Sequence, residues 1–239
     1  KIDSFLDNFQ QACKQLRYSN YPVIAAPSGL AIGGGFEVVA QTDFVAAHSN
    51  SVLGLVESLV GLIPAGGGCT EMLRRWSIDP QAKNNPHYTT LKVFNILERA
   101  LTMDSPHKSK DYKFLGPKDF IVMSRDRLIE EADKKIFLEK DNYSPPIAHS
   151  FYLPGNSVMG SISEILENLF KEKKIRDHGM AVGQKLGFML SGGNTKIQEK
   201  LSEQYLFDLE RSVFLELISM PLTQDRIKHT LETGKPLFN

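Results

Sequence analysis

The chain has 239 residues, 28 of them basic and 28 acidic, so its formal net charge at neutral pH is zero. No basic stripe with interleaved aromatic residues occurs, which argues against nucleic acid as the main partner. No signal peptide and no apolar run long enough to span a membrane is found. Cys13 and Cys69 stand far apart without metal-ligand spacing, which predicts reduced thiols in a cytoplasmic protein.

The first predicted element is an amphipathic helix over residues 2–16, whose apolar side chains recur at helical spacing. Residues 22–32 then form a small, apolar run with a β-branched start, bounded by Pro22 and by three glycines. This run predicts a buried strand of the parallel type.

Gly33-Gly34-Gly35 ends that strand, and residues 36–40 predict a short helix. The start of such a helix offers free backbone N–H groups, which suit an oxygen atom that gains negative charge. Glu37 lies in the first turn, where the helix dipole favours a carboxylate in any case. An acid that only stabilises the helix start therefore remains an alternative to a catalytic Glu37.

A second acid follows within an apolar run. After predicted strands at 43–47 and 51–55, Glu57 stands alone in the sequence LGLVESLVGLIP. An unpaired buried carboxylate is costly, so Glu57 must be hydrogen-bonded, exposed or held at a raised pKa for acid–base work. Two acids at neighbouring strand-to-helix turns could face one cavity and share a water molecule.

Another glycine run, Gly66-Gly67-Gly68, opens a predicted helix over residues 70–76. It lacks the Gly-Lys-Ser/Thr ending of a nucleotide-binding phosphate loop, and Gly33 to Gly35 lacks the dinucleotide-binding spacing. The elements expected further along are a surface loop at 77–90, a helix at 91–101, an irregular basic segment at 105–113, a strand at 120–123, a helix at 124–137 capped by Ser124, and a linker at 143–155.

The rest of the chain is predicted to be helical, at 158–174, 178–190, 198–219 and 223–233, with glycines at 192, 193 and 234 as C-caps and Pro221 ending the third helix. His178 and His229 have no partners at ligand spacing, so we interpret both as surface or core histidines and expect no metal site. A stripe of residues 201, 205, 209, 214 and 217 is expected to pack against the spiral part or a neighbouring domain rather than to bind a cofactor.

The motifs in the first third resemble a known family. AIGGGFE from Ala31 to Glu37, Glu57 twenty residues later within GLVESLVGLIPAGGG, and the trailing glycines are together similar to the crotonase superfamily, also called the enoyl-CoA hydratase/isomerase family. The resemblance implies an α/β fold built as a spiral of strand-strand-helix turns, followed by a helical C-terminal region. We expect the spiral part over residues 1–155, with a surface insertion, and the helical region over 156–239.

The resemblance also implies site residues. Glu37 and Glu57 would hold the water that adds to an enoyl thioester, Glu37 as the base and Glu57 as the acid that protonates the α-carbon. Gly34 would donate one oxyanion-hole N–H, and the Ala65 backbone would help to hold the water. Lys108, Lys110 or Lys113 could meet coenzyme A phosphates, but solvated lysines are the preferred interpretation.

The C-terminal sequence narrows the resemblance to the long bacterial 3-hydroxyacyl-CoA dehydrogenases of β-oxidation, which carry a hydratase-like domain at the C-terminus. It implies that Lys1 is not a natural start and that Asn239 lies near the natural end. The partners would be an acyl-CoA substrate, an N-terminal dehydrogenase domain of the same parent chain, which would use NAD, and possibly further copies of the chain. No cofactor is expected in these residues themselves.

The first spiral turns and the second oxyanion donor are expected to be missing, which predicts a fragment inactive on its own. Double-bond isomerisation is one alternative, although it usually needs only one carboxylate. A non-catalytic acyl-CoA-binding or assembly module that stabilises the dehydrogenase is the other.

Overall fold

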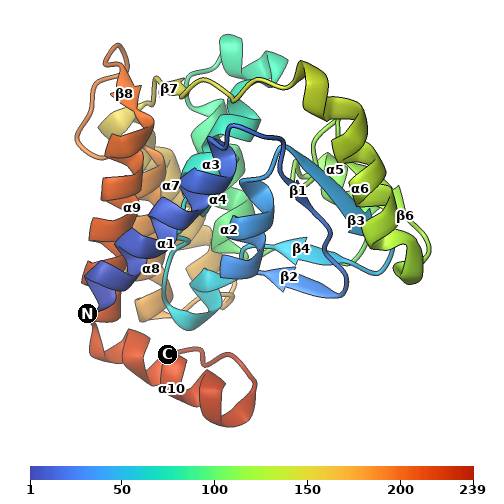
Figure 1. Ribbon diagram of the computed structural model, residues 1–239. Coiled ribbons are helices and arrows are strands. Elements are labelled where there is room, and N and C mark those ends of the chain that lie inside the picture. Colours follow the sequence, from blue (N-terminus) through green and yellow to red (C-terminus); the bar gives the residue numbers. More distant parts are fainter.

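The computed structural model describes residues 1–239 as a mixed α/β molecule (Figure 1). The strands are β1 (Ile24–Ala25), β2 (Leu30–Ile32), β3 (Phe44–His48), β4 (Val52–Gly54), β5 (Thr102–Met103), β6 (Phe120–Val122), β7 (Ser150–Phe151) and β8 (Leu201–Ser202). The helices are α1 (Ile2–Arg17), α2 (Gly34–Ala40), α3 (Gly68–Ser77), α4 (Tyr88–Glu98), α5 (Pro106–Asp111), α6 (Leu128–Glu139), α7 (Met159–Lys171), α8 (Asp177–Leu190), α9 (Glu203–Ile218) and α10 (Pro221–Thr233). No helix has the length and apolar content needed to cross a bilayer.

The chain winds through repeated strand-strand-helix units. β1, β2 and α2 form one unit, and β3, β4, the 3₁₀ turn η1 (Glu57–Val60) and α3 form the next. Equivalent strands pair in parallel: β1 with β3 and β3 with β6 in one sheet, and β2 with β4 in another, where β5 adds an antiparallel strand. This winding confirms the expected spiral.

The expectation of one buried strand at 22–32 is wrong. Pro27 and Gly29, which has a positive φ of 78°, turn the chain between β1 and β2, so the two short strands join different sheets. The turn is fixed from the next unit, since Ser51 Oγ donates to the Pro27 carbonyl at 2.8 Å. Leu30 of β2 is 75% exposed, so this strand is not buried as expected.

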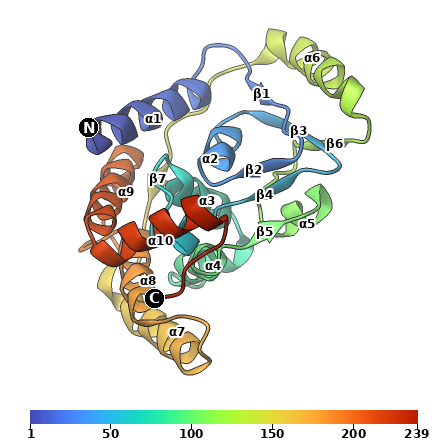
Figure 2. The same cartoon turned by 90° about the horizontal axis from the view of Figure 1, so that it is seen from below.

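A single apolar cluster joins the spiral to the C-terminal helices. It contains Phe36 from α2, Leu73 from α3, Phe94 from α4, Leu186 from α8 and Leu206 from α9. α1 and α9 lie side by side at the left of Figures 1 and 2, and α10 crosses the lower end of the molecule against η1. A smaller cluster seats α6 on the outer face of β3 and β6.

Two expectations about the middle of the chain are wrong. Residues 106–111 form helix α5 rather than an irregular segment, because Ser105 accepts a hydrogen bond from the His107 amide and Pro106 occupies the first helical position. Ser124 does not cap a long helix. Its side chain makes no capping bond, and α6 begins only at Leu128 after a 3₁₀ turn.

The C-terminal helices occur as expected, with shifted starts. Leu201 and Ser202 form β8, which pairs with β7, a strand that lies within the expected linker. α9 therefore begins at Glu203, with Ser202 as its N-cap. Pro221 begins α10 at its first helical position. The predicted stripe is partly wrong, because Tyr205 is 40% exposed. The buried face of α9 contains Leu206, Phe207, Glu210, Val213 and Leu217.

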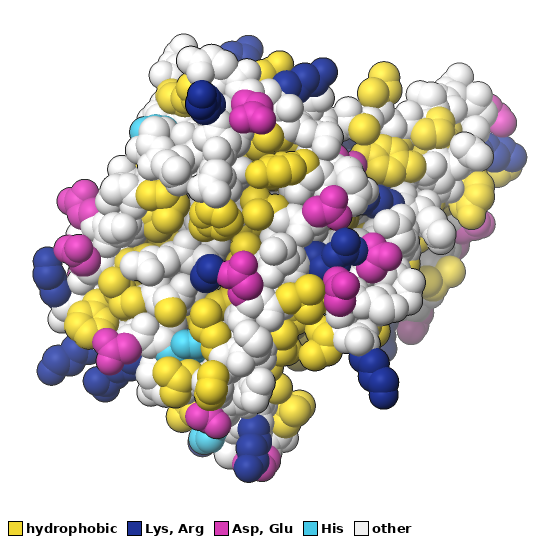
Figure 3. Space-filling model, turned by 90° about the vertical axis from the view of Figure 1, so that its left-hand side faces the viewer, with side chains coloured by type: hydrophobic (Ala, Val, Ile, Leu, Met, Phe, Trp, Pro, Cys, Tyr) yellow, Lys and Arg dark blue, Asp and Glu magenta, His cyan; other side chains and the backbone are white.

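On the side of the molecule that carries α9, acidic and basic side chains are interspersed among apolar ones (Figure 3). This face shows no extended region of one charge sign. The observation agrees with the balanced composition of the chain.

Candidate active site

Glu37 belongs to α2, and its carboxyl group is buried against the start of α3, the next helix in the spiral. It leaves the first turn of α2, which begins after Gly33 with a positive φ of 57°. Its Oε1 atom accepts hydrogen bonds from the amides of Gly66 and Gly68, both at 2.8 Å. Burial of this side chain, which is 3% exposed, raises the pKa of Glu37, while the two amides act in the opposite direction.

Glu57 opens η1, directly after β4 has brought the chain back beside β2. A Cβ atom placed on Gly33 would lie 3.2 Å from Glu57 Oε1, so any side chain at this position would crowd the carboxyl group. The other oxygen, Oε2, is shielded from solvent and accepts no hydrogen bond from the chain. Burial, and then the charge of Glu37, raise the pKa of Glu57.

The structure therefore places the two predicted acids around one pair of glycines. Glu57 borders Gly33, and a Cβ on Gly34 would lie 4.0 Å from Glu37 Oε2. The two carboxyl groups differ in their surroundings. Glu37 is fixed by two backbone donors, which stabilise its charged form, whereas Glu57 has an oxygen without any donor and retains a proton more readily.

Gly34 and Ala65 lie at the borders of this site. Gly34 is the first residue of α2, and its amide precedes the hydrogen-bonded part of the helix. Ala65 is buried, and its carbonyl accepts a hydrogen bond from Gln10 Nε2 at 2.8 Å. The same Gln10 nitrogen donates to the Phe207 carbonyl at 2.9 Å, so α1 ties the glycine loop to α9.

A third buried carboxyl group was missed in the sequence. Glu210 of α9 is 0% exposed and accepts hydrogen bonds from the Gly67 amide at 2.9 Å, and from the Thr70 amide and hydroxyl at 2.6 and 2.7 Å. Burial and the charge of Glu37 raise its pKa well above the usual value. Its position on the apolar face of α9, with Leu206, Val213 and Leu217, is the signal that could have revealed it.

Glu37 and Glu210 therefore bind alternate amides at the start of α3. Gly66 and Gly68 donate to Glu37, while Gly67 and Thr70 donate to Glu210. Side chains have no room inside this loop, since a Cβ on Gly66 would come within 2.1 Å of the Phe9 ring and 2.8 Å of Glu37 Oε2. The glycines thus allow two acids to approach one helix N-terminus, where backbone N–H groups compensate their charge.

The histidines lie elsewhere. His178 Nε2 lies 2.8 Å from the Thr223 hydroxyl, which donates to the Gly61 carbonyl at 3.1 Å. His178 is thus a core histidine with a hydrogen-bond partner, and burial lowers its pKa. No group of three or more His, Cys, Asp or Glu side chains has a geometry that could hold a metal ion.

Comparison with known proteins places this arrangement in a family. Residues 1–83 match the family model described as enoyl-CoA hydratase/isomerase. The fold matches the crystal structure of an enoyl-CoA hydratase/isomerase from Pseudoalteromonas atlantica T6c with a TM-score of 0.55 at 15% identity, over 95% of this chain and 68% of that one. Residues 1–83 thus match the enoyl-CoA hydratase/isomerase family, also called the crotonase superfamily, and the whole chain shares the fold of this solved structure.

Similarity over nearly the whole chain extends to longer relatives. A protein of Bacillus subtilis (strain 168) named "Probable 3-hydroxyacyl-CoA dehydrogenase" is 30% identical over 100% of this chain and 30% of its own length. A Rickettsia felis protein named "Putative fatty acid oxidation complex trifunctional enzyme" is 27% identical over 95% of this chain and 28% of its own length. The chain thus spans less than a third of the length of these two curated relatives.

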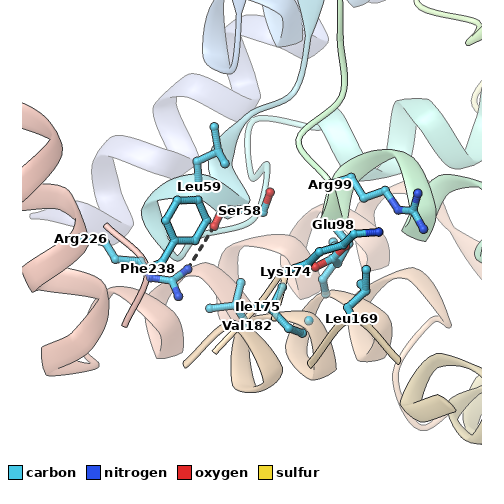
Figure 4. Close-up of a pocket in the computed structure, with 13 residues that line it drawn as sticks. Ser58, Leu59, Glu98, Arg99, Leu169, Lys174, Ile175, Val182, Arg226 and Phe238 are labelled. Carbon is cyan, nitrogen blue, oxygen red and sulfur yellow. Dashed lines mark hydrogen bonds between the residues drawn. The ribbon is translucent and has the colours of Figure 1, made fainter. Parts of the chain in front are cut away.

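A pocket of about 360 Å³ lies beside η1, next to the residues that follow Glu57 (Figure 4). Ser58 and Leu59, which follow Glu57, form one wall, and Ile175 and Val182 form another. Arg226 closes one end of the pocket, where its Nη1 atom donates a hydrogen bond to the Ser58 carbonyl at 3.4 Å. The pocket is largely apolar, with charged side chains of Glu98, Arg99 and Lys174 at the other end.

Proposed function

We propose that this chain is the hydratase part of a fatty-acid β-oxidation enzyme and catalyses the reversible hydration of a trans-2-enoyl-CoA to a 3-hydroxyacyl-CoA. The observation that supports this best is the convergence of two carboxyl groups of raised pKa, the buried Glu37 and the half-buried Glu57, on the glycines that start α2. Hydration needs a base for water and an acid for the α-carbon, and carboxyl groups held at raised pKa serve both roles near neutral pH.

The two roles follow from the difference in hydrogen bonding. Glu37, whose charged form two amides stabilise, takes a proton from water as the water oxygen bonds to the β-carbon. Glu57, whose Oε2 has no donor, gives its proton to the α-carbon. The Gly34 amide polarises the thioester carbonyl while negative charge collects on its oxygen, and the Ala65 backbone helps to hold the water.

The share of each relative that is matched supports a longer parent chain. We propose that the parent also carries a dehydrogenase domain, which uses NAD to oxidise the 3-hydroxyacyl-CoA that hydration produces. The glycine loops of this chain lack dinucleotide-binding spacing, and the Gly66 to Gly68 loop is filled by Phe9 and two glutamates. The hydride step therefore belongs outside these residues.

Isomerisation of the double bond is the second candidate. It needs a single group that removes and returns a proton, and Glu57 is the acid with an oxygen free to do so. An enzyme of this kind would convert 3-enoyl-CoA to 2-enoyl-CoA without consuming water. The two reactions are separated by the substrate supplied and by the need for Glu37.

The test is loss of the enoyl-thioester absorbance of crotonyl-CoA, measured for the chain and for a parent chain with a complete N-terminal spiral. Glu57→Gln should lower kcat by roughly 10²- to 10⁴-fold, because the proton donor is lost while the shape is kept. Glu167→Gln, on the exposed face of α7, is the matched control and should leave kcat unchanged.

Hydration by the parent chain but not by residues 1–239 would support the two-glutamate site and would show that residues outside this chain contribute to it. Coenzyme A thioester binding without turnover in either protein would contradict the hydratase proposal and favour a binding or assembly module. Turnover of 3-enoyl-CoA that survives Glu37→Gln would favour the isomerase.

A further inference from the structure

A second cavity, of about 590 Å³, lies at the C-terminal ends of α2 and α3. The two-glutamate site lies at the other, N-terminal, ends of these helices. The cavity lies between the C-terminal ends of these helices and the chain from Lys110 to Asp119. Six cationic side chains line it, and only two of its lining residues are hydrophobic. The cations are those of Arg17, Arg74, Arg75, Lys110, Lys113 and Lys118.

The arginines are held by one buried carboxylate. Glu71 forms ion pairs of 2.5 Å with Arg17, Arg74 and Arg75, which hold its pKa far below the usual range. Three guanidinium groups on a single carboxylate leave a surplus of positive charge in a fixed geometry. Arg75 spends its remaining donors on backbone carbonyls, but Arg74 Nη1 has no partner in the chain.

The acids in the lining do not neutralise this surplus. Asp43 accepts hydrogen bonds from the Val23 amide and the Tyr143 hydroxyl, and Asp119 from the amides of Val45 and Gly116. These hydrogen-bond donors are neutral, and neither acid forms an ion pair with a cation of the cavity, although the charges of Arg75 and Lys110 act on Asp119. The ammonium groups of Lys110 and Lys118 form no ion pair, whereas Lys113 pairs with Asp79.

The cavity is separate from the two-glutamate site. Glu37 and Glu57 meet at the N-terminal ends of α2 and α3, whereas Arg17 and Arg75 bind the Ala40 carbonyl at the C-terminal end of α2. A rise of 1.5 Å per residue gives about 10 Å along α2 and about 15 Å along α3 between the two ends. A ligand in the cavity therefore does not occupy the reacting site.

We propose that this cavity binds a phosphate-bearing ligand of nucleotide size, such as a nucleoside diphosphate. Phosphate oxygens suit fixed guanidinium groups, and the exposed lysines Lys110 and Lys118 attract a multiply charged anion. The six cationic side chains favour an anion over a neutral acyl chain, and the volume lies in the range of small-molecule sites. The proposal does not depend on the hydratase activity.

The test is isothermal titration calorimetry, which measures the affinity of the folded chain for ADP, inorganic phosphate and coenzyme A. The variant Lys110→Glu/Lys118→Glu should weaken ADP binding at least about tenfold, since it reverses two charges at the mouth. The matched control Lys200→Glu/Lys228→Glu changes net charge equally at exposed lysines elsewhere and should alter affinity less than about twofold. Circular dichroism confirms that both variants fold.

Absence of ADP binding at about millimolar concentration, or equal loss in both double variants, would overturn the proposal, because non-specific attraction then suffices. Equal affinity for phosphate and ADP would overturn the nucleotide size. Coenzyme A that competes with ADP and loses affinity in the Lys110 and Lys118 variant would support the site and identify the coenzyme as its source of phosphate.

Discussion

At the scale of single residues, the site is a set of acids held at one helix start. Glu37 and Glu210 share the amides that open α3, and Glu57 lies close enough for the charge of Glu37 to raise its pKa. These groups destabilise the folded chain when all are ionised, because burial removes their hydration. Function and stability therefore depend on pH in linked ways.

We predict that the free energy of unfolding falls as pH rises from about 5 to 8. Glu37, with a pKa of about 7, and Glu57, with a pKa of about 8, bind protons in the folded chain that the unfolded chain releases near its usual value of 4.5. Glu210 is shifted in the same direction. More protons bound in the folded state means that stability is lost as pH increases through this window.

Glu210→Gln removes one of these groups, so the free energy of unfolding should fall less steeply with pH, by up to about 1.4 kcal/mol per pH unit. Urea denaturation across the pH range measures it, with Glu167→Gln as the exposed control. His149 and His178, whose pKa values burial lowers, are present in both proteins, so their contributions to the pH dependence cancel in the comparison. Identical slopes in the wild type and Glu210→Gln would contradict the prediction. Glu71 acts in the opposite sense, since its depressed pKa gives stability that is lost only below about pH 4.5.

At the scale of elements, glycines set how closely helices approach. α7 and α8 pack through Gly183 and Gly187, where an added Cβ would lie 2.3 Å from a Leu166 methyl and 2.8 Å from an Ile162 methyl. Both neighbouring side chains are fully buried, so they have little room to move. This helix pair in turn supports α4 and α9, and through α9 it supports Glu210.

Gly183→Ala should lower the free energy of unfolding by about 1–3 kcal/mol, because the methyl group overpacks the contact with Leu166. Gly160→Ala on α7 is the matched control, since nothing lies within 4 Å of its added methyl. It should raise stability by roughly 0.5–1 kcal/mol through the lower entropy of the unfolded chain. Urea denaturation measures both, and a neutral Gly183→Ala would show that α7 and α8 separate freely.

At the scale of the whole molecule, the spiral and the C-terminal helices share one core. Leu73 and Phe94 belong to the same apolar cluster as Leu186 and Leu206, and Glu210 closes the start of α3 from the C-terminal side. Removing one part would expose the apolar surface of the other. The division into residues 1–155 and 156–239 is thus one of sequence character, and we propose that the two parts fold together.

We predict that the chain unfolds in a single thermal transition, with calorimetric and van't Hoff enthalpies that agree. A chain of residues 1–155 alone should lack the near-ultraviolet circular dichroism of packed aromatic side chains, because α8 and α9 no longer cover α3 and α4. Two resolved transitions, or a folded 1–155 chain, would show that the spiral is an independent domain.

Particular elements show how far sequence reasoning reached. The amphipathic α1, the strands β3 and β6, and helices α7 to α10 were predictable, because periodicity and turn residues act locally. The strand at 22–32 failed because Pro27 and Gly29 divide it between sheets that only the spiral brings together. The segment at 105–113 failed because a cap and Pro106 start a helix too short to show a period.

The sequence by itself predicted Glu37 and Glu57 as paired acids, because they stand at a fixed spacing among glycines in a local pattern. The resemblance of these motifs to the crotonase superfamily predicted the fold and the roles of the two acids. Only the tertiary structure decided that Glu210 joins them from a helix more than 130 residues away along the chain, and that Arg17, Arg74 and Lys110 surround one cavity. Such contacts arise from packing between distant segments, and no local periodicity records which buried polar group meets which.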